Sequence, residues 1–203
     1  MMKTLLFLVL GFIALSLIVT AFLPGSYLFF LWGISALILI VGAFLPASYT
    51  VERSIEIAKP AEVAYALVAD YNNWLKWSPW PKMDPEAKQT VTGTPGAAGH
   101  SWSWEGEKSG VGSMTLASAE ENRSVQSKLV FKEPMTSEAD DYILLEPTPT
   151  GTKVTWRRSK NLPYPVGRFF GLGMEGMLGP PFEEGLAGVK SIAESIEEPR
   201  PRR

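Results

Sequence analysis

Aromatic side chains are the most prominent groups in this sequence that could do chemistry. The 203-residue chain has no cysteine and a single histidine, His100, which excludes disulfides, cysteine nucleophiles and histidine-rich metal clusters. We therefore expect neither a metal nor a cofactor. Six of the seven tryptophans lie after residue 73. Such rings bury large apolar areas and carry one N–H donor, so they suit a hydrophobic ligand, although similar rings also form protein cores.

A glycine-rich stretch, 166–178, adds adaptable side chains to this aromatic set. Phe170, Met174 and Met177 sit there at helical spacing, and methionine accepts varied apolar shapes. Each glycine weakens a helix, so the stretch either opens as an entry portal or packs closely on a sheet. The residues that we expect to bind a ligand are Trp77, Trp80, Trp102, Trp104, Phe131, Trp156, Phe170, Met174 and Met177.

Groups that could act as an acid or a base are isolated in the sequence. His100, Glu105 and Tyr142 are the nearest candidates for such a role, and none is assigned as catalytic. Adjacent acidic pairs such as 140–141 are expected on solvated turns and surfaces. The arginines at 157–158 read as a surface pair, or alternatively as a partner for the acidic head of a ligand.

Two nucleotide-related functions are disfavoured. Residues 171–176 match the pattern GxGxxG, but no βαβ unit surrounds them, and a dinucleotide site requires one. The net charge is −2, so no basic field draws in nucleic acid.

Charge is absent from almost the whole N-terminal part of the chain. Lys3 is the single charged residue before position 49, and the uncharged runs 4–23 and 27–45 are each long enough to span a bilayer as a helix. Pro24 and Gly25 separate the runs with a turn signal. We predict that residues 1–48 form a two-helix transmembrane hairpin, with the lipid bilayer as a partner.

The topology of this anchor follows from the number of spans. Two spans place Lys3 on the same side as Arg53 and Lys59, and the positive-inside bias makes that side cytoplasmic. One alternative is a signal peptide cleaved near 19–21, which would leave the second run as an anchor. Another is a helical hairpin buried in a protein core.

The remaining sequence predicts an α+β domain over residues 49–198, followed by a tail at 199–203. A strand over 49–57 precedes a helix that begins near Pro60 and a short helix at 74–77. Alternating runs separated by turn residues predict about six strands between 88 and 158. A long C-terminal helix is predicted by an apolar stripe at Phe182, Leu186, Val189, Ala193 and Ile196.

This order of elements resembles the SRPBCC superfamily, which includes START-type and birch-pollen-allergen-like proteins and the polyketide cyclase/lipid-transport group. The resemblance rests on 49–57 (YTVERSIEI), 58–70 (AKPAEVAYALVAD), 74–80 (WLKWSPW), the stretches around Trp104 and Gly112, and 151–156 (GTKVTW). It implies a helix-grip fold, in which a curved antiparallel sheet of about seven strands wraps the C-terminal helix and encloses an apolar cavity. Membrane-anchored bacterial members are the most similar.

We therefore predict a membrane-anchored binding or carrier domain for a hydrophobic small molecule or lipid, with no role for nucleic acid. Two alternatives stay open. One is an enzyme of the cyclase or hydrolase type, which needs a desolvated acid or base facing the cavity. The other is an interaction module whose interior is filled by its own side chains.

Overall fold

The computed structural model describes residues 25–196. Among these residues, one compact unit consists of 25–45 and 163–169, and a second consists of 46–162 and 170–196. The second unit contains the whole sheet and all the residues expected to bind a ligand.

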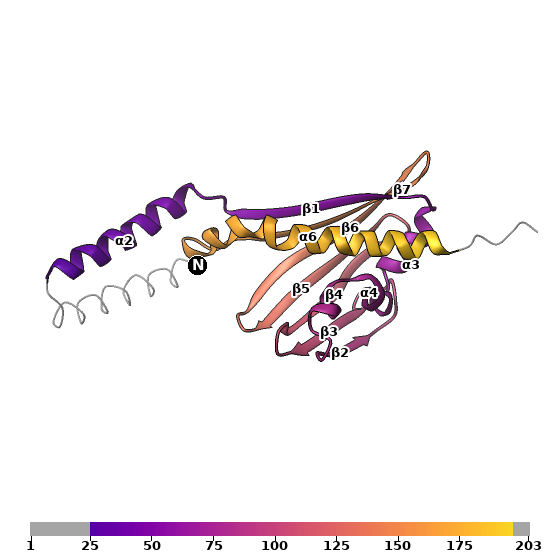
Figure 1. The fold of residues 1–203 in the computed structure, drawn as a ribbon, viewed down its shortest axis with the longest axis horizontal. Helices are drawn as coiled ribbons and strands as arrows, with labels where there is room; N and C mark the ends of the chain where they lie inside the picture. The colour runs from indigo at the N-terminus through magenta and orange to yellow at the C-terminus, as the bar shows by residue number, and fades with distance from the viewer. Residues whose placement is uncertain (1–24, 197–203) are drawn as a thin grey trace, which may run out of the picture. The chain divides into compact units, whose positions relative to one another are not determined.

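One antiparallel sheet of seven strands forms the frame of the second unit (Figure 1). Along the sheet the order is β1-β7-β6-β5-β4-β3-β2, so the first and last strands of the chain lie side by side. The predicted α+β class and the number of strands are confirmed. The strands are β1 (Ser48–Ile57), β2 (Lys88–Thr92), β3 (Ser101–Gly106), β4 (Gly110–Glu120), β5 (Ser124–Glu133), β6 (Ser137–Thr148) and β7 (Gly151–Asn161).

Short helices fill the connection between β1 and β2. These are α3 (Ala61–Val68), α4 (Tyr71–Trp77) and α5 (Trp80–Met83). Asp70 caps α4, because its carboxylate accepts the N–H of Asn72 at 2.9 Å. The short helix expected at 74–77 therefore begins three residues earlier, at Tyr71.

Helix α6 (Val166–Ser195) includes the glycine-rich stretch, and its residues from 170 onward lie along one face of the sheet in Figure 1. Pro180 and Pro181 interrupt its hydrogen bonding, since neither has an N–H to donate to the carbonyls of Gly176 and Met177. The helix therefore consists of two halves, 166–179 and 182–195, with a break in hydrogen bonding between them.

The second half of α6 is packed directly on the tryptophans of the inner face. Trp156 of β7 stacks on Phe182 with ring centroids 4.2 Å apart and planes 5° apart. A Cβ atom at Gly185 would lie 2.7 Å from the Trp156 ring, and one at Gly188 would lie 2.7 Å from the Trp77 carbonyl oxygen. Gly185 thus allows α6 to approach β7 closely, and Gly188 allows it to approach the end of α4.

The first unit contains α2 (Gly25–Phe44) and the segment 163–169. Arg168 closes the C-terminal end of α2, because its Nη1 donates to the carbonyl oxygens of Gly42 at 3.0 Å and Leu45 at 3.3 Å. The Tyr164 hydroxyl donates to the carbonyl of Leu39 at 2.9 Å. The Gly42 carbonyl is one of the last four of α2, which a helix end otherwise leaves without donors.

The predicted transmembrane hairpin finds no support in the part of the chain that is described. The first predicted span, 4–23, lies outside it. The second corresponds to α2, but among residues 25–196 no helix combines the length and the apolar character needed to cross a membrane.

Candidate functional site

The inner face of the sheet packs against α6. A row of polar side chains lies on this face toward the start of β6, the end of β7 and the start of β1, which we call the β6–β7–β1 end. One row across the ladder places Ser127 opposite Asp141, Asp141 opposite Arg158, and Arg158 opposite Val51. The alternation of side chains along a strand directs these four residues to the same face as Trp156. This row lies one pleat away from the tryptophan core.

A buried ion pair is the central feature of this row. Asp141 is 2% exposed and Arg158 is 6% exposed. Arg158 Nε donates to Asp141 Oδ2 at 2.5 Å, Nη2 contacts the same oxygen, and the indole N–H of Trp156 donates to Oδ1. Both carboxylate oxygens are therefore occupied, as a buried charge requires. The expectation that 140–141 and 157–158 are solvated is wrong for these two residues.

Burial dominates the electrostatics of the row. It raises the pKa of Asp141, and the neighbouring Arg158 guanidinium and Trp156 N–H oppose that rise. The guanidinium carbon of Arg158 lies 5.2 Å from the centroid of the Phe182 ring and 6.0 Å from that of Trp80. The cation is thus placed beside aromatic faces, which attract it.

The next row outward contains two groups that could bind a polar ligand. Tyr49 lies opposite Lys160 in the β1–β7 ladder, and both are half-buried. Burial is the main reason why the pKa of Tyr49 is raised, so its hydroxyl is a neutral donor at pH 7. Lys160 Nζ donates to the hydroxyl oxygen of Ser137 on β6.

Four of the tryptophans expected to bind a ligand are buried and contact other aromatic rings. Trp77 and Trp156 are 5.6 Å apart between centroids, and Trp102 and Trp104 are 5.0 Å apart. Trp74, which was not among the expected site residues, connects the two pairs at 4.6 Å from Trp77 and 6.5 Å from Trp102. In this conformation these rings occupy the interior themselves.

The other expected residues lie nearer the surface. Trp80, Phe131 and Met174 are partly buried and pack against the core, whereas Phe170 and Met177 are exposed on α6. The structure therefore brings Trp80 close to the ion pair and leaves Phe170 and Met177 accessible on the first half of the helix.

The acid and base candidates from the sequence do not face this interior as reactive groups. Buried His100 bridges two loops, since its Nε2 accepts the N–H of Tyr71 and its Nδ1 lies 2.9 Å from the Thr92 carbonyl oxygen. Glu105 is exposed on β3. Tyr142, of opposite parity to Asp141, lies under the Arg157 guanidinium on the outer face of the sheet.

A sequence comparison decides the family. The family model described as "Polyketide cyclase / dehydrase and lipid transport" matches residues 48–194. The chain belongs to this family. Its fold is accordingly the SRPBCC fold, a type that serves hydrophobic-ligand binding or cyclase chemistry. No match is found among curated proteins.

Several solved structures share the fold of this family member at low sequence identity. Protein MLL2253 from Mesorhizobium loti is 18% identical, with 70% of this chain and 97% of that chain covered and a TM-score of 0.52. A protein from Thermobifida fusca is 18% identical, with 76% and 99% covered and a TM-score of 0.54. The di-domain ARO/CYC StfQ of the steffimycin biosynthetic pathway is 12% identical, with 73% and 51% covered and a TM-score of 0.55.

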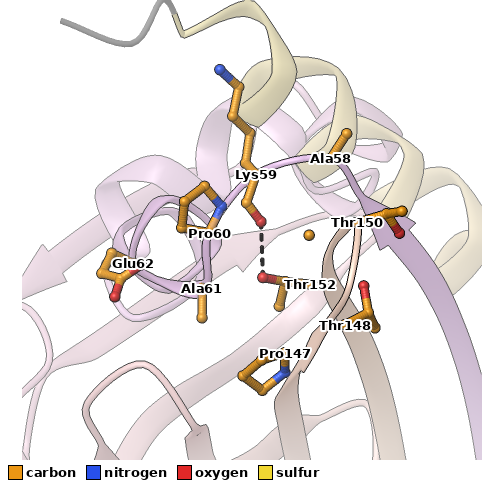
Figure 2. Close-up of a pocket in the computed structure, with 10 residues that line it drawn as sticks. Ala58, Lys59, Pro60, Ala61, Glu62, Pro147, Thr148, Thr150 and Thr152 are labelled. Carbon is orange, nitrogen blue, oxygen red and sulfur yellow. Dashed lines mark hydrogen bonds between the residues drawn. The ribbon is translucent and has the colours of Figure 1, made fainter. Parts of the chain in front are cut away.

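This family member also has an open surface pocket of about 500 Å³ (Figure 2). The pocket lies where β1 ends and β7 begins, at the other end of these strands from the buried ion pair. The turn between β1 and α3 and the hairpin between β6 and β7 form its walls. The Thr152 hydroxyl donates to the Lys59 carbonyl across the pocket at 2.9 Å. Its lining is Ala58, Lys59, Pro60, Ala61, Glu62, Pro147, Thr148, Thr150, Gly151 and Thr152.

Proposed function

We propose that this protein binds a hydrophobic small molecule or lipid between the inner face of the sheet and residues 170–179 of α6. The observation that carries this proposal is the arrangement at the β6–β7–β1 end. There, partly exposed Trp80 lies beside the buried ion pair. Phe131 of β5 and Met174 of α6 are also partly exposed and pack against the core. An apolar ligand covering such side chains gains roughly 25 cal/mol per Å² of buried apolar area.

The first half of α6 is the element that would move to admit the ligand. It contacts the strands through Leu162, whose Cδ1 would lie 2.5 Å from a Cβ at Gly171, and through Arg53. Arg53 pairs with Glu175 before the proline break and with Glu183 after it, both at 2.6 Å. Displacing residues 170–177 therefore breaks the ion pair with Glu175 and uncovers Met174, and it leaves buried Leu178 and the second half of the helix in the core.

We also propose that the N-terminal part attaches the protein to a lipid bilayer, with the binding domain on the cytoplasmic side. In support, residues 4–48 contain no charged side chain. On α2, Phe29, Phe30 and Phe44 are 82%, 67% and 86% exposed. A helix with such a surface favours an apolar environment over water. Attachment would raise the effective concentration of lipid at the site.

Native mass spectrometry of the full chain, purified in detergent and then transferred to phosphatidylcholine nanodiscs, tests the binding function. We expect an additional mass on the protein, and organic extraction should release a hydrophobic molecule. An unliganded mass, together with unchanged tryptophan emission across a panel of fatty acids and lipids, would refute the binding function. Extraction of cell membranes with carbonate tests the attachment separately, because a protein whose apolar segment is inserted in the bilayer stays in the pellet, whereas one that is absent from the membrane or bound to it only by charge is released.

A second candidate is an interaction module that binds no small molecule. The mutual packing of Trp74, Trp77, Trp102 and Trp156 favours it, because these rings leave the interior occupied. An enzyme of the cyclase type is less well supported. Asp141 is the carboxylate that faces the interior in the row described above, and its two oxygens already accept hydrogen bonds.

A further inference from the structure

We propose that the ligand is an apolar monocarboxylic acid, and that Lys160 and Tyr49 bind its carboxylate. This inference rests on the binding function proposed above and specifies the chemistry of the ligand. It starts from the position of Lys160 on β7. Lys160 has the same parity as Trp156 and Arg158, so it belongs to the inner face of the sheet, and it is half-buried there.

The positive charges at this end of the sheet are unequally compensated. Arg158 is paired with Asp141, and Arg53 with two glutamates of α6. Within residues 25–196, no carboxylate lies within ion-pair distance of the Lys160 ammonium, whose partner is the neutral Ser137 hydroxyl.

The nearest acidic residues on β6 cannot compensate this charge. Glu138 and Asp140 have the opposite parity to Ser137 and lie on the outer face, where Lys128 pairs with them at 3.3 and 3.7 Å. The inner face at this end therefore carries one uncompensated cation, and a bound anion would compensate it.

Tyr49 supplies a second donor for the same anion. Residues that face each other in an antiparallel ladder have Cβ atoms about 5 Å apart, so the Tyr49 and Lys160 side chains start from neighbouring positions on the same face. The Lys160 ammonium extends to Ser137 on β6, and binding of the anion would turn it toward the Tyr49 hydroxyl. The Tyr49 hydroxyl makes no hydrogen bond to the described residues. An ammonium and a hydroxyl can each donate to one oxygen of a carboxylate.

The side chains near these donors are apolar, so the rest of the acid should be apolar as well. Met174 is one helical turn before Leu178 and two before Phe182, so the inward stripe of α6 continues over this end of the sheet. The carboxylate would stay at the half-buried end while the apolar body lies against Met174 and Trp80. A neutral ester or alcohol of the same shape would fill the apolar part but leave the ammonium uncompensated.

Quenching of tryptophan emission by dibromostearic acid and by its methyl ester tests the inference. The full chain is held in phosphatidylcholine nanodiscs, and Trp32 of α2 is replaced by Phe so that emission comes from the binding domain. Lys160→Met is compared with Lys153→Met, since Lys153 is an exposed residue of the same strand that pairs with Glu146 at 3.5 Å. For each ligand, the variant is compared with the parent protein. Acid and ester partition differently into the bilayer, but this difference is the same for the parent and the variant and does not affect the comparison.

We expect Lys160→Met to lower the binding affinity for the acid by about tenfold to a hundredfold, because hydrogen bonds to charged groups contribute about 1.5–3 kcal/mol. The affinity for the ester should stay nearly unchanged. Lys153→Met should behave as the parent, and thermal unfolding should show that both variants fold. If Lys160→Met affects the acid and the ester equally, the inference is wrong although binding stands. If neither ligand quenches the parent, the binding function itself fails.

Discussion

Two glycines of the same helix should respond in opposite directions to the same substitution. At Gly185, an alanine Cβ would lie 2.7 Å from Cζ3 of Trp156 and 3.4 Å from both the Trp77 ring and Pro79. Trp156 cannot easily yield, because it is stacked on Phe182 and its N–H is bound to Asp141. At Gly173, nothing lies within 4 Å of the added Cβ.

The expected magnitudes follow from these distances. Alanine in place of glycine gains about 0.5–1 kcal/mol in a helix, and this gain is common to both sites. Overpacking a rigid core costs about 1–3 kcal/mol, and this cost applies to Gly185→Ala only. The two variants should therefore differ by about 1–3 kcal/mol, which corresponds to roughly 2–4 °C per kcal/mol for a chain of this size.

Urea unfolding of the full chain in nanodiscs, followed by tryptophan emission, measures the difference. Gly173→Ala should be as stable as the parent or slightly more stable, and Gly185→Ala should be less stable. Equal stabilities for the two variants would mean that α6 does not pack on Trp156 at this distance. The structural account of the inner face would then be refuted.

Three further results are expected. Asp141→Asn removes one partner of a buried ion pair and should destabilise the protein by about 3–5 kcal/mol in urea unfolding, whereas replacing Asp141 and Arg158 together by apolar residues should cost less. Hydrogen bonds from the Ser109 hydroxyl and N–H lower the pKa of Asp84, so the stability advantage over Asp84→Asn should be full above about pH 4 and shrink as the pH falls below it. Arg53→Ala removes the ion pairs on both sides of the proline break, so amide exchange in 170–179 should accelerate while 185–193 keeps its protection.

The sequence predicts much of the frame because periodicity reports which side chains share a face. The stripe from Phe182 to Ala193 is buried as expected, and the alternation of Val125, Ser127 and Leu129 matches the inner face of β5. The first half of α6 was expected only as a helix start, and the structure continues the helix through the whole glycine-rich stretch.

The buried ion pair was missed, although the sequence carried a signal for it. Adjacent Asp and Arg pairs look solvated when they are considered as pairs. Residues two apart on a strand share a face. Asp141 therefore points inward with Ile143, and Arg158 points inward with Trp156. Parity gives a face but no distance, so whether the tryptophans fill the interior or line a cavity could not be decided before the packing was known.

The proline break in α6 also bears on how stability and function could be altered independently in this protein. Proteins often lose stability when they acquire a strained or mobile site, because the same residues serve both purposes. Here Phe182 and Gly185 hold the core on one side of Pro180 and Pro181, while Met174 and the exposed Phe170 lie on the other. Substitutions that change ligand preference in 166–177 therefore need not reach the tryptophan core, and mutational tolerance should fall abruptly from buried Leu178 onward, just before the two prolines.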